Sequence, residues 1–283
     1  MDYSKKSYTI GGKEFRFNKA YVMGILNVTP DSFSDGGLYS RLDNAVELGL
    51  ELLNDGADIL DIGGESTKPG SKPVSEEEEL KRVIPVIDKI LSLKSDATIS
   101  VDTTKNKVAL EALKLGAKIV NDISGLTLDP EILHTVKKYD AALVIMHMKG
   151  TPQDMQINPY YDDVISEIFN FLYQQTQKAQ DYGVTKLFVD PGMGFGKRPE
   201  DNIEIIKRLS DFKSLGYPIL IGASRKSFLG NILNLDVKER DEASSIVEAI
   251  AIINGARIIR THNVKYGVNV CKLLNALISD DQY

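Results

Sequence analysis

The sequence predicts a (β/α)₈ barrel preceded by a short N-terminal β-hairpin. Along the 283 residues, short runs rich in Ile, Val and Leu alternate with longer amphipathic stretches. This alternation is typical of parallel strands that are buried on both faces by helices. Glycines at positions 56, 116, 183 and 255 each precede such a run, as expected where a glycine ends a helix. The eight runs occupy residues 21–27, 57–63, 98–102, 118–124, 142–148, 186–192, 218–224 and 257–262.

The N-terminal segment, residues 1–19, is expected to form an extension of the barrel. Residues 8–17 (YTIGGKEFRF) contain two short alternating runs around Gly11 and Gly12, which predicts a two-residue hairpin turn. No linker or shift in composition interrupts the rest of the chain, so we expect a single domain over residues 1–283. A doubly wound open sheet is the alternative, because it also alternates strands with helices.

The helices between the strands have ordinary amphipathic patterns. Ser75 and Glu78 form a capping-box pattern at the start of one of them. The four glutamates at 76–79 are interpreted as a solvated helix face whose negative charge suits the first turn. The predicted helices are residues 44–53, 75–90, 105–115, 161–182 and 243–253.

The composition argues against several classes of protein. The net charge of −6, from 34 Lys and Arg against 40 Asp and Glu, disfavours a broad nucleic-acid surface. No apolar run approaches the ~20 residues that span a bilayer, and the N-terminus lacks the apolar region of a signal peptide. The single cysteine, Cys271, cannot form an intramolecular disulfide and is interpreted as a packing residue. We therefore expect a cytoplasmic protein that binds neither membrane nor nucleic acid.

The active site of such a barrel lies at the carboxyl ends of its strands, so the polar residues there are the candidates. Carboxylates and amides end the middle strands, whereas cationic residues follow the last two strands, where barrels often bind phosphate. The pattern predicts a ligand with an N–H-rich head and an anionic tail. Taken alone, Asp102 has a second interpretation as the N-cap of the helix at 105–115. The strand-end residues are Asn27, Asp61, Asp102, Asn121, Asp122, Met146, His147, Asp190, Ser224, Arg225, Lys226, Arg260 and His262.

Three of the strands are followed by loops with distinctive sequences. Residues 190–197 (DPGMGFGK) do not match a P-loop or a dinucleotide fingerprint, and are interpreted as a tight loop whose backbone approaches a ligand. Residues 27–37 and 63–73 are long polar loops, and loops of this length often act as lids.

The sequence gives little support for a transition-metal site or an enzyme nucleophile. His134, His147 and His262 lie on different elements without ligand spacing, so a zinc site is not expected. The side-chain oxygen of Asn27, with nearby acids and a ligand's phosphates, suits Mg²⁺. No arrangement of Ser, His and Asp or of Cys and His follows from the spacing.

The motifs at the strand ends resemble those of the dihydropteroate synthase family over nearly the whole chain. The resemblance implies a TIM barrel that, in folate biosynthesis, condenses 6-hydroxymethyl-7,8-dihydropterin diphosphate with 4-aminobenzoate and releases diphosphate. It also implies a transferase that is a sulfonamide target and usually a homodimer. The motifs are GILNVTPDSFSDGG at 24–37, DIGGESTKPG at 61–70, SVDTTK at 100–105, NDISG at 121–125, MHMKGTP at 146–152, DPGMGFGK at 190–197, SRKSFLG at 224–230 and IRTHNV at 259–264.

Transferred motif by motif, the resemblance assigns each end of the site. The pterin would be held by Asp102, Asn121, Asp190 and Lys226, with Met146 packing on its ring. Diphosphate and Mg²⁺ would bind at Asn27, Arg260 and His262. The aminobenzoate pocket would be bordered by Thr67, Lys68, Pro69, Phe195 and Ser227.

Two positions depart from the family pattern. Lys68 stands where the family has arginine in ESTRPG, which keeps the charge but loses the bidentate fork. Asn263 stands where the family frequently has aspartate in HDV.

The expected mechanism needs no enzyme nucleophile. Arg260, His262 and Mg²⁺ assist the departure of diphosphate, and Lys226 acts beside them. Carboxylates, chiefly Asp102, stabilise the resulting pterin cation. The arylamine then attacks this cation. A methyltetrahydrofolate:corrinoid methyltransferase-like barrel is the alternative, but the SRK and RTH motifs and the loop at 27–37 argue against it. An open-sheet nucleotide-binding enzyme lacks its glycine fingerprints here, and a non-catalytic binding module is a third alternative.

Overall fold

Eight parallel strands close into a barrel in the computed structural model, which describes residues 6–29 and 38–278. Along the chain they are β3 (Tyr21–Asn27), β4 (Ile59–Gly63), β5 (Ile99–Asp102), β6 (Ile119–Asp122), β7 (Ala142–Met146), β8 (Leu187–Asp190), β9 (Ile219–Ile221) and β10 (Ala256–Thr261). Because β10 pairs with both β3 and β9, the sheet is closed and the open-sheet alternative is wrong. The predicted barrel is therefore confirmed.

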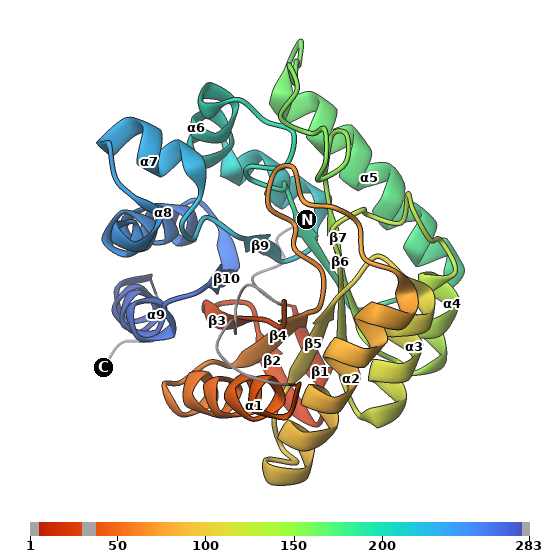
Figure 1. Ribbon diagram of the computed structural model, residues 1–283. Helices are drawn as coiled ribbons and strands as arrows, with labels where there is room; N and C mark the ends of the chain where they lie inside the picture. Colours follow the sequence, from red (N-terminus) through yellow and green to blue (C-terminus); the bar gives the residue numbers. More distant parts are fainter. Residues whose placement is uncertain (1–5, 30–37, 279–283) are drawn as a thin grey trace.

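Helices surround the barrel on its outer side (Figure 1). They are α1 (Leu38–Asn54), α2 (Glu76–Leu93), α3 (Asn106–Leu115), α4 (Ile132–Lys138), α5 (Val164–Tyr182), α6 (Pro199–Lys207), α7 (Ser227–Leu233), α8 (Asp241–Ile253) and α9 (Val264–Ile278), with 3₁₀ turns η3 (Leu209–Leu215) and η4 (Val237–Glu239). The five predicted helices correspond to α1, α2, α3, α5 and α8. Helices α4, α6, α7 and α9 lie outside the predicted ranges. The first three have seven to nine residues, too few turns for a clear period, whereas α9 has 15. No helix within the described part of the chain is long and apolar enough to cross a membrane.

The N-terminal hairpin closes one end of the barrel. Strands β1 (Ser7–Ile10) and β2 (Lys13–Arg16) pair in antiparallel fashion around Gly11 and Gly12, whose φ angles of 58° and 79° are those of a type I′ turn. The Tyr8 hydroxyl donates to the carbonyl of Leu187, the first residue of β8. The hairpin therefore covers the amino ends of the strands and leaves their carboxyl ends open for a site.

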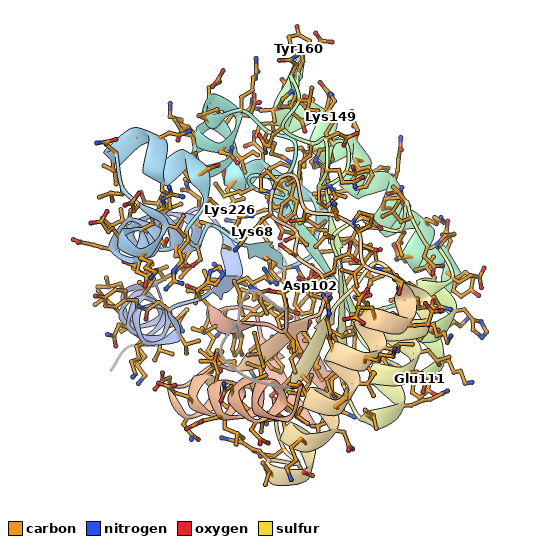
Figure 2. The ribbon with its side chains drawn as sticks, in the orientation of Figure 1. Lys68, Asp102, Glu111, Lys149, Tyr160 and Lys226 are labelled. Carbon is orange, nitrogen blue, oxygen red and sulfur yellow. The ribbon has the colours of Figure 1, made fainter. Side chains whose placement is uncertain are left out.

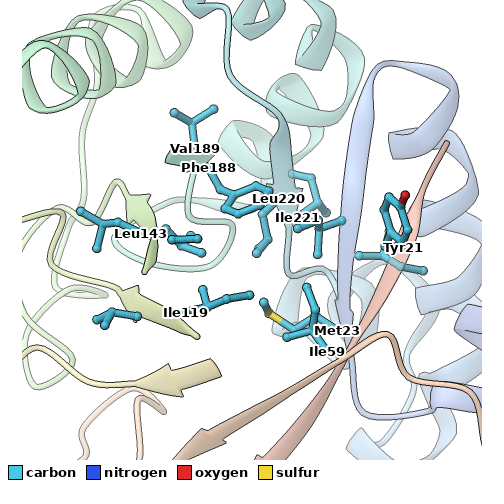
Figure 3. Packing of buried hydrophobic residues seen from close by; sticks show 14 of the residues in the cluster. Tyr21, Met23, Ile59, Ile119, Leu143, Phe188, Val189, Leu220 and Ile221 are labelled. Carbon is cyan, nitrogen blue, oxygen red and sulfur yellow. The ribbon is translucent and has the colours of Figure 1, made fainter. Parts of the chain in front are cut away.

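Apolar side chains fill the barrel beneath the carboxyl ends of its strands. Met23, Ile59, Ile119, Phe188 and Leu220 come from five strands and are fully buried in one cluster (Figure 3). This interior is a packed core, as is usual for barrels of eight strands. Above this core, polar side chains occupy the carboxyl-terminal part of the inward face, with Asp61 and Ser100 each two residues before the end of its strand.

Strand register brings several candidate residues to one level. Asn27 pairs with Gly63, Gly63 with Asp102, and Asp102 with Asn121. A Cβ atom at Gly63 would lie 3.3 Å from the Cβ of Asp102. A larger residue there would crowd Asp102, so glycine keeps the space between neighbouring strand ends open.

Two predictions about helix starts need correction. The Ser75 hydroxyl accepts the N–H of Glu78, but the Glu78 carboxylate binds Arg82 instead of completing the capping box. Lys105 is the N-cap residue of α3, while Asp102 accepts from Arg260, so the N-cap interpretation of Asp102 is wrong.

Candidate active site

Arg260 links two carboxylates at the mouth of the barrel. Its Nε lies 2.6 Å from Oδ2 of Asp61, and its Nη2 lies 2.7 Å from Oδ2 of Asp102. The sequence pattern put cations on the last strands and carboxylates on the middle ones. In the structure Arg260 reaches from β10 to the carboxylates of β4 and β5, so the two charge groups meet at this guanidinium.

Asp61 also belongs to this cluster. It was among the strand-end candidates in the sequence, but no substrate was assigned to it. It is fully buried, its Oδ2 also accepts from Asn121 Nδ2 at 3.0 Å, and its Oδ1 has no hydrogen-bond partner within the described residues. The alternation of β4 contained the signal, because Asp61 shares the inward face with Gly63, the neighbour of Asp102. By accepting hydrogen bonds from Arg260 and Asn121, Asp61 holds both side chains in place from the interior of the barrel.

The environment of Asp102 favours its protonated form. Burial raises its pKa to about 7, against the lowering effect of Arg260, and the nearby Asp61 and Glu79 raise it further. A ligand that offers hydrogen-bond donors would lower this pKa again, because such donors stabilise the ionised carboxylate.

Asp190 lies at the end of β8 in a similar setting. Its Oδ1 accepts the N–H of Gly192 at 2.7 Å. Burial raises its pKa to about 6, although this hydrogen bond and the ammonium groups of Lys226 and Lys197 lower it. Oδ2 has no such donor within the described residues and is available to a ligand.

An apolar patch lies beside these acids. Met146 and Phe195 pack with Ile123, Met155 and Met148 in a cluster separate from the main core. This is the type of surface on which a flat ring packs, with the acids at its edge.

The ammonium group of Lys226 lies over one of these rings. Its Nζ is 4.2 Å from the centre of the Phe195 ring. Burial and Arg260 lower its pKa to about 8, while Asp190 and Asp102 act in the opposite direction.

The loop after β8 packs its backbone tightly against the neighbouring loop. Gly192 has a φ of 69°, and a Cβ there would lie 1.9 Å from the carbonyl oxygen of His147. Lys197, at the end of the loop, is buried and donates to the carbonyls of His147 and Phe195 and to His147 Nδ1 at 3.0 Å. The burial of Lys197 could not be predicted from the sequence, since a lysine after a glycine-rich loop is usually solvated.

His262 is held in place by Ser224. The Ser224 hydroxyl accepts the backbone N–H of His262 at 3.1 Å and lies 3.0 Å from its Nδ1. Burial, Arg225, Arg260 and Lys226 lower the pKa of His262 to about 3, so the free protein carries a neutral imidazole. An anion would favour its protonated form.

Asn263 links the start of α9 to the loop after β9. Its Oδ1 accepts the N–H of Tyr266, and its Nδ2 lies 3.0 Å from Oδ2 of Asp241. Asp241 in turn accepts two hydrogen bonds from Arg225, a non-glycine residue with a φ of 57°. The amide thus serves as N-cap and as donor to the carboxylate that holds Arg225.

The remaining predicted residues lie on the rim. In Figure 2, Lys68 and Lys226 lie near the centre of the helix ring with Asp102, whereas Glu111, Lys149 and Tyr160 lie at its edge. Lys68, Pro69 and Ser227 are exposed, and Thr67 is half-buried. Gly70 donates its N–H to the Pro152 carbonyl at 2.8 Å, which joins two of the loops.

Asn27 ends β3 at the level of Asp102 and is half-buried. Within the described residues, no three His, Cys, Asp or Glu side chains form a metal-binding group. A protein site with a single amide oxygen is chemically suited to a hard cation that takes most of its ligands from phosphate and water. The predicted lid after β3 falls largely on residues 30–37, which lie outside the described residues.

Comparisons with known proteins agree with this geometry. Residues 23–262 match the family described as pterin binding enzyme. The chain is 45% identical to the dihydropteroate synthase of Synechocystis sp. over 98% of this chain and 96% of that protein. It is 43% identical to the Escherichia coli dihydropteroate synthase over 95% of each.

Solved structures give the same result. The dihydropteroate synthase of Xanthomonas albilineans with 4-aminobenzoic acid superimposes with a TM-score of 0.89 at 39% identity, covering 96% of this chain and 97% of that chain. The Yersinia pestis dihydropteroate synthase in a sulfonamide drug complex gives a TM-score of 0.89 at 41% identity, over 96% and 99% of the two chains.

Proposed function

The chain belongs to the dihydropteroate synthase family, and from this premise we propose how its residues bind and join the two substrates. The enzyme is a transferase of folate biosynthesis that condenses 6-hydroxymethyl-7,8-dihydropterin diphosphate with 4-aminobenzoate to give 7,8-dihydropteroate and diphosphate. The alternative, a corrinoid methyltransferase-like barrel, is not favoured, because the relatives that match nearly the whole chain are synthases.

The pterin head binds between the carboxylates of Asp102 and Asp190. The observation that carries this assignment is that two buried acids with raised pKa values flank an apolar patch containing Met146. The guanidine-like edge of a pterin offers parallel N–H donors, which a carboxylate with a free oxygen accepts. Asn121 supports the same edge from β6, and Lys226 contributes from the loop after β9.

The diphosphate binds at Arg260 and His262. In the free enzyme Arg260 already lies beside the pterin acids, and its charge is retained because Asp61 and Asp102 raise its pKa despite burial. His262 is neutral in the free enzyme, so it donates from one ring nitrogen until an anion raises its pKa. Together the two side chains oppose the charge that develops on the leaving group.

Mg²⁺ fits the same end of the site. Asn27 would supply one oxygen ligand, and the diphosphate and water would complete the hard-oxygen set that this ion prefers. When bound, the ion supplies positive charge to the departing diphosphate oxygens.

The aminobenzoate lies under the loop formed by residues 64–74. Thr67, Lys68 and Pro69 border it from this loop, while Phe195 and Ser227 border it from the loops after β8 and β9. The Phe195 ring is buried against Lys226, which gives the ring of the second substrate an apolar surface next to a cation.

In the reaction, the carbon–oxygen bond to diphosphate breaks first and its electron pair leaves with the diphosphate. The positive charge left on the pterin is stabilised by the ionised carboxylate of Asp102. The neutral arylamine then forms the carbon–nitrogen bond and releases one proton. Holding both substrates in place and excluding water contributes much of the rate.

The enzyme is further proposed to be a cytoplasmic homodimer that is inhibited by sulfonamides. The sulfonamide complex of the Yersinia pestis relative supports the last point. Competition between a sulfonamide and 4-aminobenzoate, and sedimentation of the purified protein, test these statements directly.

The proposed function is tested by product formation. Purified protein, Mg²⁺, pterin diphosphate and labelled 4-aminobenzoate should give labelled dihydropteroate and one equivalent of diphosphate. Omission of either substrate should abolish the product. Diphosphate release with no incorporation of aminobenzoate would contradict the assignment.

A further inference from the structure

Lys105 joins the loop at residues 64–74 to helix α2. Its Nζ lies 2.5 Å from Oε2 of Glu79 and also donates to Oε2 of Glu65. Glu65 belongs to the loop, Glu79 to the first turn of α2, and Lys105 to the N-cap position of α3. One ammonium group therefore ties three separate segments together.

Glu79 makes this arrangement rigid. The run of four glutamates predicts a solvated helix face, but the Glu79 side chain is 1% exposed, and its Oε1 has no hydrogen-bond partner within the described residues. A buried carboxylate needs a charged partner, and Lys105 is the one with which it forms an ion pair. Burial lowers the pKa of Lys105, but the hydrogen bonds to Glu65 and Glu79 outweigh this effect, so the ammonium stays charged.

Glu65, Lys105 and Glu79 form a charged triad, and Glu65 is its more exposed carboxylate. Its side chain is 23% exposed, and it precedes Thr67 by two residues and Lys68 by three. Elsewhere, the same loop is held through backbone atoms, with Arg82 Nη1 donating to the Gly64 carbonyl at 2.8 Å. The ion pair to Lys105 thus ties the loop to α3 two residues before Thr67, whereas the contact between the Ser66 and Ser71 hydroxyls, at 3.0 Å, lies within the loop itself.

The triad and the site share a wall. Glu65 and Glu79 line a small cavity of about 50 Å³ together with Thr67, Asp102 and Met148. A movement of Glu65 would therefore shift Thr67 relative to Asp102.

We propose that Lys105 is a positioning residue for the second substrate: through Glu65, anchored by buried Glu79, it sets the loop that carries Thr67 and Lys68 over the aminobenzoate. This inference rests on the proposed function, in which those two residues border that substrate. It assigns a role to Glu65, Glu79 and Lys105, which are not among the residues assigned to either substrate.

The test is the variant Glu65→Gln, which weakens the loop contact but leaves the buried pair of Lys105 and Glu79 intact. The matched control is Glu76→Gln. Glu76 pairs with Lys107 at 3.1 Å and so also links α2 to α3, but it does not contact the loop. Both variants lose one carboxylate from a partly buried side chain, 23% exposed in Glu65 and 35% in Glu76, so both should fold.

We expect Glu65→Gln to raise the KM for 4-aminobenzoate about 5- to 10-fold, with the KM for pterin diphosphate and the Tm nearly unchanged. Hydrogen exchange in the peptide spanning residues 64–74 should be faster than in the wild type. Glu76→Gln should match the wild type in all four measurements. If the aminobenzoate KM of Glu65→Gln stays within twofold, or rises equally in the control, the positioning role is refuted.

A second variant pair, Lys105→Met with Glu79→Leu, removes the buried charges together. Replacing a buried pair by apolar residues is often tolerated. This double variant should reproduce the KM effect of Glu65→Gln, and an aminobenzoate KM like that of the wild type would also refute the proposal. Failure of the wild type to form dihydropteroate would instead refute the proposed function, so the two failures are distinguishable.

Discussion

Arg260 and Asp102 are in direct contact, with Nη2 and Oδ2 2.7 Å apart, although strands β3 and β4 separate β10 from β5. The residue proposed to bind the leaving diphosphate is thus the charge partner of the residue proposed to stabilise the cation. When diphosphate binds the guanidinium of Arg260, this one positive charge interacts with both the Asp102 carboxylate and the leaving group. The two ends of the site are therefore electrostatically coupled.

This coupling predicts the effect of Arg260→Gln on pterin binding. Arg260 lowers the pKa of Asp102, which lies at about 7. Loss of the guanidinium should raise that pKa by about 1 unit or more. Affinity for 6-hydroxymethyl-dihydropterin falls when Asp102 becomes protonated at low pH, so in the variant this fall should begin at a higher pH. Calorimetric titrations from pH 5.5 to 8.5 measure this, with Arg208→Gln on the surface as control. An unshifted pH profile would show that Asp102 does not depend on Arg260.

Asp190→Asn should weaken pterin binding strongly. Asp190 keeps one oxygen on the Gly192 N–H and has the other available for the ligand, and an amide can replace at most one of these acceptors. We expect a loss on the order of 2 to 4 kcal/mol in binding free energy. Calorimetry decides the matter, with Asp211→Asn as a control of equal charge change at an exposed site. Affinity within threefold of the wild type would remove Asp190 from the site.

The sequence predicted the barrel and most strand ends because both follow from local patterns. The eight apolar runs and the four helix-ending glycines are local features, and recognising them needs no knowledge of distant contacts. What it missed depends on tertiary packing. The run at 76–79 has the composition of a solvated face, yet Glu79 is buried because Lys105 reaches it from another element. The position of Arg260 between Asp61 and Asp102 likewise depends on three strands that only barrel closure brings together.

Asn263 shows a similar limit. It departs from the family pattern, and the sequence alone does not indicate what the change does. The structure gives it two hydrogen bonds, one as N-cap of α9 and one to Asp241, which holds Arg225. An aspartate could provide the cap but not the donor, because an ionised carboxylate only accepts hydrogen bonds.

Glu248→Gln should remove a pH dependence of stability. Glu248 is buried on α8 behind Thr261, one oxygen has no partner within the described residues, and burial raises its pKa from 4.5 to about 8. Between these two values the folded state binds more protons than the unfolded state, so stability falls as pH rises from about 4.5 to about 8. Thermal unfolding at pH 5, 6.5 and 8 measures the slope, and each kcal/mol corresponds to roughly 2–4 °C in Tm for chains of about 150–250 residues.

The variant should show a smaller drop in Tm across this range than the wild type, because glutamine does not ionise. The exposed Glu242→Gln on the same helix serves as control and should follow the wild type. Parallel curves for Glu248→Gln and the wild type would show that Glu248 does not contribute to the pH dependence.

The last prediction concerns Lys68, whose side chain is exposed on the loop at residues 64–74. If the family's guanidinium organises the closed loop through bidentate or stacking contacts, an ammonium leaves that state less populated. Lys68→Arg should then lower the KM for 4-aminobenzoate while pterin affinity stays nearly constant. Lys68→Ala should raise that KM by a factor of order 10, which corresponds to about 1.4 kcal/mol of lost charge interaction. Steady-state kinetics measure both, with Lys72→Ala as an exposed control on the same loop. If neither Lys68 variant changes this KM by more than about twofold, or if Lys72→Ala changes it equally, Lys68 is an ordinary solvated residue and the aminobenzoate assignment fails at that position.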